Sequence, residues 1–451
     1  MRDQQTIFIT SFHPLIMRNI LATPILDYLL EKNVRVVVFA PEKTKFYFEW
    51  EFESRGVIVE SVSRALSWQD RLFRYLSLAA LNTRALAIKR KTELEGSGTW
   101  LAPILGRSRV LRAFVRALER RLMPRDRFAV FIERYRPSAV FATDVQHAND
   151  VRLLHEARAR RIPAVGMVRS WDNLTSKGFI RVIPDILLVN NEVVREEAIR
   201  LHDIPADQIR VVGIPHYDAY LTNRRSSREE FFKRISGDPA KRLIVFAPTG
   251  DRYLSNNDVD PGILAALREY APRDCQILVR LPPHDSVASL EKLASDARVI
   301  IERPAPPYAT VNPRKIEFDF EMDRHLADTL AHASLVISGP STIAIDAAFF
   351  DAPIILAAFD GFAVRPYRES VRRYFDYEHH QPILASGGAR IARTVAEFRR
   401  YLNEYLAHPE LDRAGRKKIV ATECWRVDGR SSHRVAEALL GAMGNLGEKS
   451  E

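Results

Sequence analysis

The sequence has little cysteine and no long apolar run. Its 451 residues include two cysteines, Cys275 and Cys424. Two cysteines form neither a disulfide framework nor a metal-ligand cluster, so we expect thiols in a hydrophobic core, a reducing compartment and no structural zinc. No apolar run approaches the roughly 18 residues that a membrane span requires. The first residues, MRDQQTIFITSFHP, lack the long apolar region and cleavage site of a signal peptide. We therefore expect a soluble protein that stays in the cytoplasm.

What is present indicates a globular chain with two large domains. Hydrophobic residues make up 46% of the sequence and charged residues 27%. The length is too great for one hydrophobic core, because domains usually contain about 150 residues.

The charge is unevenly distributed. The net charge is +10, and residues 84–127 carry twelve lysines and arginines against four acidic residues. Such an excess suggests an anionic partner. Because no zinc finger, basic zipper or aromatic RNA-binding signature is present, a membrane surface is favoured over nucleic acid.

One basic segment has helical periodicity. In SRVLRAFVRALERRLM, the periodicity predicts an apolar side surrounded by arginines, the pattern of a helix on an anionic bilayer. The apolar residues are Val110, Leu111, Phe114, Val115, Leu118 and Leu122, and the arginines are Arg112, Arg116, Arg120 and Arg121. A core-packed helix with a solvated basic face would give a similar pattern.

Short apolar runs alternate with helical stretches, which predicts parallel β-sheets. The runs are 6–10, 34–40, 139–143, 164–168 and 186–190, then 243–247, 276–280, 299–302, 335–338 and 353–357. We predict an α/β protein with two Rossmann-like, doubly wound domains facing a cleft. The N-terminal domain covers residues 1–222 with a helical basic insertion at about 64–125, a linker covers 223–242, the C-terminal domain covers 243–427, and a helix and tail cover 428–451.

Polar side chains follow several N-terminal strands, where parallel sheets bind ligands. His13 follows the first strand and is a candidate general base, because imidazole titrates near neutral pH. Asp144 follows the strand at 139–143 and is a second candidate, unless it only caps the next helix. The strand at 164–168 is followed by RSWDNLTSKG. There Asp172 would deprotonate an acceptor hydroxyl, while the cations and the amide would bind the acceptor; these side chains are Arg169, Asn173 and Lys177.

The segment LVISGPSTIAIDAAFFDAPIIL predicts a phosphate site in the C-terminal half. A strand passes through Gly339-Pro340 into a helix that begins near Ser341 and Thr342, with Asp346 one turn further along. Free backbone N–H groups and the helix dipole would bind a nucleotide diphosphate there. An ordinary strand–helix connection with Ser341 as a cap is the alternative.

Further donor-binding candidates follow two other C-terminal strands. They are Thr249, Arg252, Arg280 and His284. Cations and an imidazole would offset the charge of a leaving phosphate, although turn residues alone would give a similar sequence. The pair Asp258 and Asp260 lies in SNNDVDPG, where carboxylates are common, so we expect no obligatory metal or other cofactor.

Six segments together resemble bacterial GT-B transferases of the CDP-glycerol glycerophosphotransferase and surface-polysaccharide type. In chain order they are SWDNLTSKG, NNEVVREEAIRLHDIPADQIRVVGIPHYDAY, APTGDR, RLPPHD, SGPSTIAIDAAFFDAPI and DGRSSHRVAEALL. The resemblance covers about residues 135–445.

The resemblance implies a donor bound by the C-terminal domain, an acceptor on the N-terminal side and a peripheral place at the inner membrane. Carried over by position, Ser341 and Thr342 would bind the donor phosphates, Asp346 would lie near the ribose and His284 would meet the pyrophosphate. Where the family's polymerases have an HGT-type motif, this sequence has SWDN, so Asp172 would replace the histidine base and the donor would be a nucleotide sugar instead of CDP-glycerol. We expect a CDP- or UDP-linked donor. A UDP-N-acetylglucosamine 2-epimerase-like enzyme and an idle GT-B scaffold that binds a precursor or partner protein are the alternatives.

Overall fold

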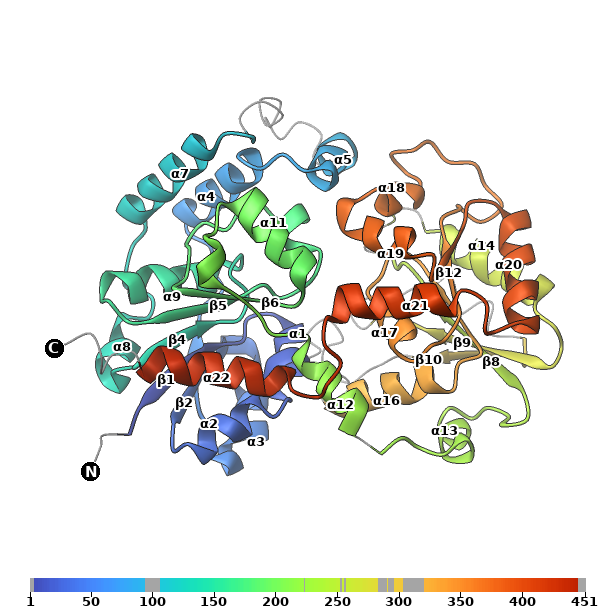
Figure 1. Cartoon of the computed structure of the whole chain (residues 1–451), viewed down its shortest axis with the longest axis horizontal. Coiled ribbons are helices and arrows are strands. Elements are labelled where there is room, and N and C mark those ends of the chain that lie inside the picture. The colour runs from blue at the N-terminus through green and yellow to red at the C-terminus, as the bar shows by residue number, and fades with distance from the viewer. Residues whose placement is uncertain are drawn as a thin grey trace. The chain divides into compact units, whose positions relative to one another are not determined.

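The chain forms two compact units, which we call the N-terminal unit and the C-terminal unit (Figure 1). The computed structural model describes residues 4–93, 106–222, 224–251, 254, 257–282, 290, 296–302 and 320–444. The N-terminal unit contains Met1–Arg90, Glu95–Leu221 and Trp425–Glu451, and the C-terminal unit contains Lys91–Leu94 and Thr222–Cys424.

The N-terminal unit is built on a seven-stranded parallel sheet with the order β3-β2-β1-β4-β5-β6-β7. The strands are β1 (Thr6–Thr10), β2 (Arg35–Pro41), β3 (Ile58–Val62), β4 (Ala139–Ala142), β5 (Ala164–Met167), β6 (Ile186–Val189) and β7 (Ile209–Val211). The central strands are buried on both faces, which explains their continuous apolar runs.

The C-terminal unit repeats this arrangement with six parallel strands in the order β10-β9-β8-β11-β12-β13. They are β8 (Arg242–Ala247), β9 (Cys275–Arg280), β10 (Val299–Glu302), β11 (Leu335–Ser338), β12 (Ile354–Ala357) and β13 (Arg390–Ala392). In both sheets the strand order reverses beside the first strand, which defines a doubly wound sheet. The predicted α/β class with two Rossmann-like domains is confirmed.

Ten of the thirteen described strands lie in apolar runs that the sequence predicts, and the other three lie at sheet edges. These are β3, β7 and β13. Their residues are only partly buried, so they lack a continuous apolar run. Edge strands need apolar side chains on fewer positions than central strands do.

The main helices pack on the two sheets. In the N-terminal unit they include α2 (Ile25–Glu31), α9 (Ala148–Ala159), α11 (Glu192–His202) and α22 (Ser431–Gly444). In the C-terminal unit they include α14 (Val259–Tyr270), α16 (Phe320–Ala331), α17 (Ile343–Phe349), α20 (Val395–Ala407) and α21 (Arg413–Ile419). The short helix α13 (Arg228–Arg234) occupies the segment that was predicted as a linker.

The C-terminal segment of the chain returns to the N-terminal unit. Helix α22 contacts α2 and strands β4, β5 and β6. Figure 1 shows it, in red, against the blue first part of the chain. At its start, the Asp218 carboxylate accepts hydrogen bonds from the backbone N–H groups of Ser431 (3.1 Å) and Ser432 (2.7 Å). The N-terminal core is therefore completed by the last helix of the chain.

The basic segment between β3 and β4 contains three helices, α4 (Trp68–Ala79), α5 (Arg84–Thr92) and α7 (Arg109–Leu122). Helices α4 and α7 lie side by side in Figure 1. They share a small hydrophobic core with members from both helices and from other segments, including Phe73, Leu86, Val115, Phe179 and Leu201.

The orientation predicted for α7 is wrong in part. Leu111, Val115 and Leu118 do pack inward, but Val110, Phe114 and Leu122 are exposed. Two of the arginines expected around the apolar side, Arg112 and Arg116, point inward instead. Arg112 is 4% exposed and donates to both carboxylate oxygens of Asp203, at 2.7 and 2.9 Å. A partly exposed acid on a neighbouring segment therefore helps to decide which side of the helix faces the core.

Cys275 and Cys424 are both buried thiols, as predicted. Among the described helices, none is long and apolar enough to cross a bilayer.

Candidate functional site

The N-terminal unit gathers its candidate residues at the carboxyl ends of β1, β4 and β5, where the strand order reverses. His13 follows β1, Asp144 follows β4, and residues 169–177 follow β5. In doubly wound sheets this is the position where ligands bind. The structure thus brings together the N-terminal candidates that the sequence analysis took from separate loops.

An ion pair fixes the charge of Asp144. Its Oδ2 accepts a hydrogen bond from Arg169 Nε at 2.7 Å, and both side chains are less than 10% exposed. Burial would raise the pKa of Asp144, but the charges of Arg169, Lys177 and His147 together hold it well below its ordinary value. Asp144 is therefore a bound carboxylate that positions Arg169, and it is poorly suited to accept a proton at neutral pH.

His13 is held as a neutral hydrogen-bond donor. Its Nδ1 accepts the backbone N–H of Leu15 at 3.2 Å, at the start of α1 (Pro14–Ile16), so in the neutral ring the proton is on Nε2. Burial and then the charge of Arg169 lower the pKa of His13 to about 2. A group with this pKa is a weak base, so the geometry favours hydrogen-bond donation over proton abstraction.

Asp172 is the third candidate base. It lies at the start of the short helix α10 (Asn173–Ser176) and is partly exposed. Ser176 Oγ donates to its Oδ2 at 3.3 Å. Nearby, burial lowers the pKa of the Lys177 ammonium, although the charge of Asp172 opposes this shift. A carboxylate beside a partly desolvated cation can accept a proton while the cation offsets developing negative charge.

Several buried polar atoms of this site have no hydrogen-bond partner among the described residues. Asn173 is 1% exposed, yet its side-chain Nδ2 and Oδ1 are both unpartnered, and so are Ser11 Oγ and Gln146 Oε1. Buried polar groups are usually satisfied, so a group of unsatisfied ones indicates that a ligand completes them. The sequence analysis did not assign Ser11 or Gln146 a role. Their positions in the loops that follow β1 and β4 are the signal that would have found them.

The C-terminal unit has a corresponding site at the ends of β8 and β11. Asp260, which is fully buried, accepts the backbone N–H groups of Thr249 and Gly250, each at 2.9 Å. Burial raises the pKa of Asp260. Gly339 approaches the same loop so closely that a Cβ placed there would lie 2.3 Å from Thr249 Oγ1, a buried hydroxyl without a partner among the described residues. The absence of a side chain at Gly339 therefore allows the turn after β11 to contact the turn after β8.

The predicted phosphate turn begins α17 with little side-chain capping. The Ser341 hydroxyl accepts the Ile343 N–H at a long 3.4 Å, and Thr342 is exposed with no capping hydrogen bond from its side chain. Both hydroxyls thus remain available to an anion. Asp346 is 4% exposed and lies in the first turn of the helix, where its charge contributes to raising the pKa of Cys424 above its ordinary value, after burial.

The remaining donor-binding candidates lie elsewhere or outside the described residues. Arg280 ends β9 and pairs with Glu302 of β10, which also binds His325. Arg252 and His284 lie outside the described residues. In the part of the chain that the structure describes, no group of three or more histidine, cysteine or acidic side chains is arranged to hold a metal ion.

Comparison with solved structures identifies the class of fold. The UDP-GlcNAc 2-epimerase from Methanocaldococcus jannaschii shares 12% identity with a TM-score of 0.55, covering 97% of this chain and 99% of that one. A glycosyltransferase from Rickettsia africae shares 9% identity with a TM-score of 0.52, covering 97% and 99%. The Neisseria meningitidis UDP-GlcNAc 2-epimerase bound to UDP-GlcNAc shares 11% identity with a TM-score of 0.55, covering 97% and 100%. The fold is of the GT-B type that these enzymes represent.

The sequence itself defines the family. The profile of the CDP-glycerol:poly(glycerophosphate) glycerophosphotransferases matches residues 181–441, which is more than half of the chain. The protein belongs to this family, as its resemblance predicted, and is a transferase. None of the curated proteins matches the sequence.

Proposed function

We propose that the protein transfers a glycosyl or polyol-phosphate group from a nucleotide-activated donor to a hydroxyl of a cell-surface polysaccharide or lipid-linked precursor. The observation that carries this proposal is the family match over residues 181–441, which includes the turn at Ser341 and Thr342. Structural neighbours solved with UDP-GlcNAc support a CDP- or UDP-linked donor.

The C-terminal unit holds the donor in this proposal. The hydroxyls of Ser341 and Thr342, with the first backbone N–H groups of the turn, bind the phosphates of the leaving nucleotide. Thr249 contributes the hydroxyl that has no partner among the described residues. Asp346, Arg252, Arg280 and His284 remain proposed donor-site residues on the basis of the sequence motifs.

The N-terminal unit binds and activates the acceptor. Asp172 takes the proton of the acceptor hydroxyl as its oxygen forms the new bond to the donor, and the bond to the nucleotide breaks with its electron pair. Asn173, Arg169 and Lys177 orient the acceptor, and His13 donates a hydrogen bond from Nε2. Asp144 fixes Arg169 through their 2.7 Å contact. We propose a cytoplasmic protein, peripheral at the inner face of the cell membrane, where such acceptors are found.

The test compares the wild type with Asp172→Asn. The variant keeps the shape of the side chain but removes the base, so turnover should fall by roughly 10²–10⁴-fold. Its melting temperature should still rise with the nucleotide that stabilises the wild type in a panel of CMP, CDP, UMP, UDP and GDP. Asp126→Asn, at an exposed position of the same unit, is the matched control and should be fully active.

Full activity of Asp172→Asn would remove this residue from the mechanism. If no nucleotide raises the melting temperature of the wild type and no donor is consumed, the chain is an idle scaffold. If UDP-GlcNAc is epimerised without an acceptor, the epimerase alternative is correct.

A further inference from the structure

The exposed apolar side chains of the C-terminal unit gather in one loop. It contains residues 358–371, between β12 and the short helix α18 (Arg372–Phe375), and we call it the β12–α18 loop. Phe362, Val364 and Tyr367 are 61%, 97% and 45% exposed. Among the described residues of the C-terminal unit, no other large hydrophobic side chain is as exposed as these three. Exposed apolar side chains that lie together indicate a binding surface, whereas single ones need no explanation.

This loop leaves the sheet beside the proposed phosphate turn at Ser341 and Thr342. Strands β11 and β12 are parallel, hydrogen-bonded neighbours, so the turn and the loop follow them at the same edge of the sheet. Helix α17, which begins at the turn, contacts both strands. Thr249 and Arg280, the other described candidates that follow or end strands here, belong to β8 and β9. The β12–α18 loop therefore borders the phosphate turn on the side away from these two candidates.

The first turn of α14 holds the β12–α18 loop in place. Gly262 and Gly361 approach so closely that a Cβ on Gly262 would lie 2.9 Å from the Cα of Gly361. Asp258 forms an ion pair with Arg365 of the loop. Residues 258–262 directly precede or begin α14 and include the carboxylate that binds the backbone of the β8 loop. One short segment thus fixes the loops after β8 and β12 relative to each other.

Two further hydrogen bonds close the β12–α18 loop. Asp360, which is 5% exposed, accepts the backbone N–H of Val371 at 2.8 Å. The Tyr367 hydroxyl donates to Asp376 at 2.6 Å. Phe362 lies within the segment that the first of these bonds closes. Because the backbone is already fixed, little conformational entropy is lost when a ligand packs on the Phe362 ring.

A nucleotide base suits this surface better than a second protein chain does. The rings of Phe362 and Tyr367 together bury at most about 500 Å². A stable protein–protein interface buries roughly 800 Å² on each partner. A planar base needs only one exposed aromatic ring, because every base has a π-face that stacks on it. The size of the surface and its place beside the phosphate turn therefore favour a nucleotide.

We propose that Phe362 stacks on the base of the donor nucleotide whose phosphates bind at Ser341 and Thr342. Val364 and Tyr367, from the same loop, extend the apolar surface around the ring. The inference rests on the proposed function and deepens it, because it assigns a residue to the base of the donor. Stacking tolerates different bases, so Phe362 contributes affinity for the nucleoside and not the choice between cytosine and uracil.

The test compares nucleotide and pyrophosphate binding to the full chain by isothermal titration calorimetry. The nucleotide is whichever of CDP, UDP and GDP binds the wild type most tightly. Phe362→Ser should weaken its binding by about tenfold or more, whereas Phe362→Trp should preserve it, because the larger ring still offers a stacking face. Inorganic pyrophosphate has no base, so the wild type and both variants should bind it equally.

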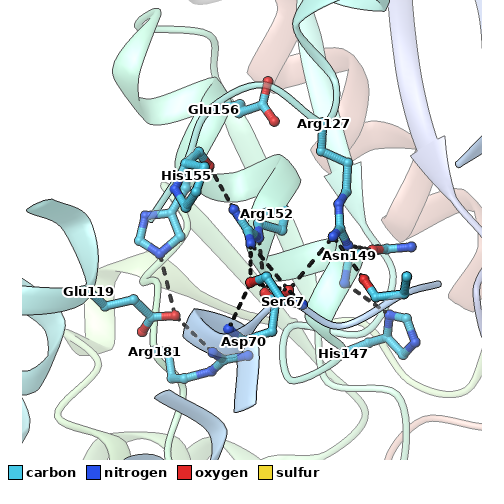
Figure 2. Close-up of polar contacts among 12 residues, drawn as sticks. Ser67, Asp70, Glu119, Arg127, His147, Asn149, Arg152, His155, Glu156 and Arg181 are labelled. Carbon is cyan, nitrogen blue, oxygen red and sulfur yellow. Dashed lines mark hydrogen bonds and ion pairs between the residues drawn. The ribbon is translucent and has the colours of Figure 1, made fainter. Parts of the chain in front are cut away.

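Trp68→Ser is the matched control, because Trp68 is also an exposed aromatic residue but lies on α4 of the N-terminal unit. The start of α4 is held without this ring. Arg152 donates to the Ser67 hydroxyl at 2.7 Å and to the Asp70 carboxylate at 2.9 Å, and Figure 2 shows these side chains together. The variant should therefore fold and bind the nucleotide like the wild type.

Unchanged nucleotide binding in Phe362→Ser would overturn the inference. An equal loss of pyrophosphate binding would also overturn it, because the substitution would then act on the phosphate turn. Weaker binding of UDP-GlcNAc without weaker binding of UDP would assign Phe362 to the transferred group instead of the base. If the wild type binds no nucleotide, the transferase proposal fails as well, so failure of the inference alone is recognised by intact nucleotide binding in the wild type.

Discussion

At the scale of the residue, burial and partners decide what each ionisable side chain does. Arg112 and Arg120 lie two turns apart on α7, yet Arg112 is bound to Asp203 inside the unit and Arg120 is exposed. His13 and Asp144 looked like bases because of their residue types. Burial and the charge of Arg169 lower the pKa of His13, whereas for Asp144 the nearby cations lower the pKa against the effect of burial. Asp172 therefore remains our proposed base.

His202 shows the same effect in a structural role. Its Nδ1 accepts the Ile180 N–H and its Nε2 lies 2.9 Å from the Leu174 carbonyl oxygen. Burial lowers the pKa of His202 to about 3, with Arg116 and Arg112 adding to the shift against the opposing Leu174 contact. Below pH ~6.5 the unfolded chain binds a proton that the folded chain does not, so stability falls as the pH is lowered toward about 3.

We therefore expect His202→Gln to flatten the pH dependence of stability. The slope of the unfolding free energy between about pH 6 and pH 4 should decrease by up to ~1.4 kcal/mol per pH unit, the value for one proton. Urea unfolding at several pH values measures it. His408→Gln, the same substitution at an exposed position, is the control. An unaltered slope in His202→Gln would show that His202 is protonated in the folded protein.

At the scale of the element, the turns after β8 and β11 depend on close backbone approach. Gly339 lies where any Cβ would meet Thr249 Oγ1 at 2.3 Å, and Thr249 is held in place through Asp260. A glycine in the turn after β11 thus allows the neighbouring loop to approach. The strand and helix that flank this turn could be predicted from their apolar runs, but the contact between the two loops could not.

Gly339→Ala should destabilise the protein by about 1–3 kcal/mol, the usual cost of overpacking, and weaken nucleotide binding. Urea unfolding and nucleotide-dependent melting measure the two effects. Removing the opposing hydroxyl in Gly339→Ala/Thr249→Ala should restore most of the stability, because the clash is with Oγ1. If the stability losses of Gly339→Ala and Thr249→Ala simply add in the double variant, the clash with Thr249 Oγ1 is not the cause of the destabilisation.

At the scale of the whole molecule, the last helix of the chain packs on the unit that the first residues form. The N-terminal unit is completed by α22, which buries Val435, Leu439 and Met443 against it. Asp218, 5% exposed, anchors the beginning of that helix through two backbone hydrogen bonds. Stability of the N-terminal unit therefore depends on residues at the far end of the sequence.

Asp218→Ala should cost about 1–2 kcal/mol, because it removes the acceptor for two N–H groups at a helix start. Hydrogen exchange of the full chain should show lower protection in α22 and α2, which contact each other, and unchanged protection in the C-terminal unit. Asp207→Ala, at an exposed position in the N-terminal unit, is the control. Equal loss of protection in both units would show that they unfold together.

The sequence by itself determined the fold class, ten of the thirteen described strands and the loops that carry the candidate residues. Strands buried on both faces need continuous apolar runs, and ligand-binding loops of doubly wound sheets follow them, so both leave local patterns. The sequence between residues 181 and 441 was also enough to define the family.

Only the tertiary structure decided which side of α7 is buried, where α22 packs and which candidate bases have strongly shifted pKa values. Each outcome depends on a partner far away in the chain. Arg112 points inward and donates to Asp203. The Asp218 carboxylate accepts the backbone N–H of Ser432, and Arg169 donates to the carboxylate of Asp144. Periodicity records the apolar surface that a helix offers, whereas an ion pair in the interior forms only after distant segments have come together, so no local pattern predicts it.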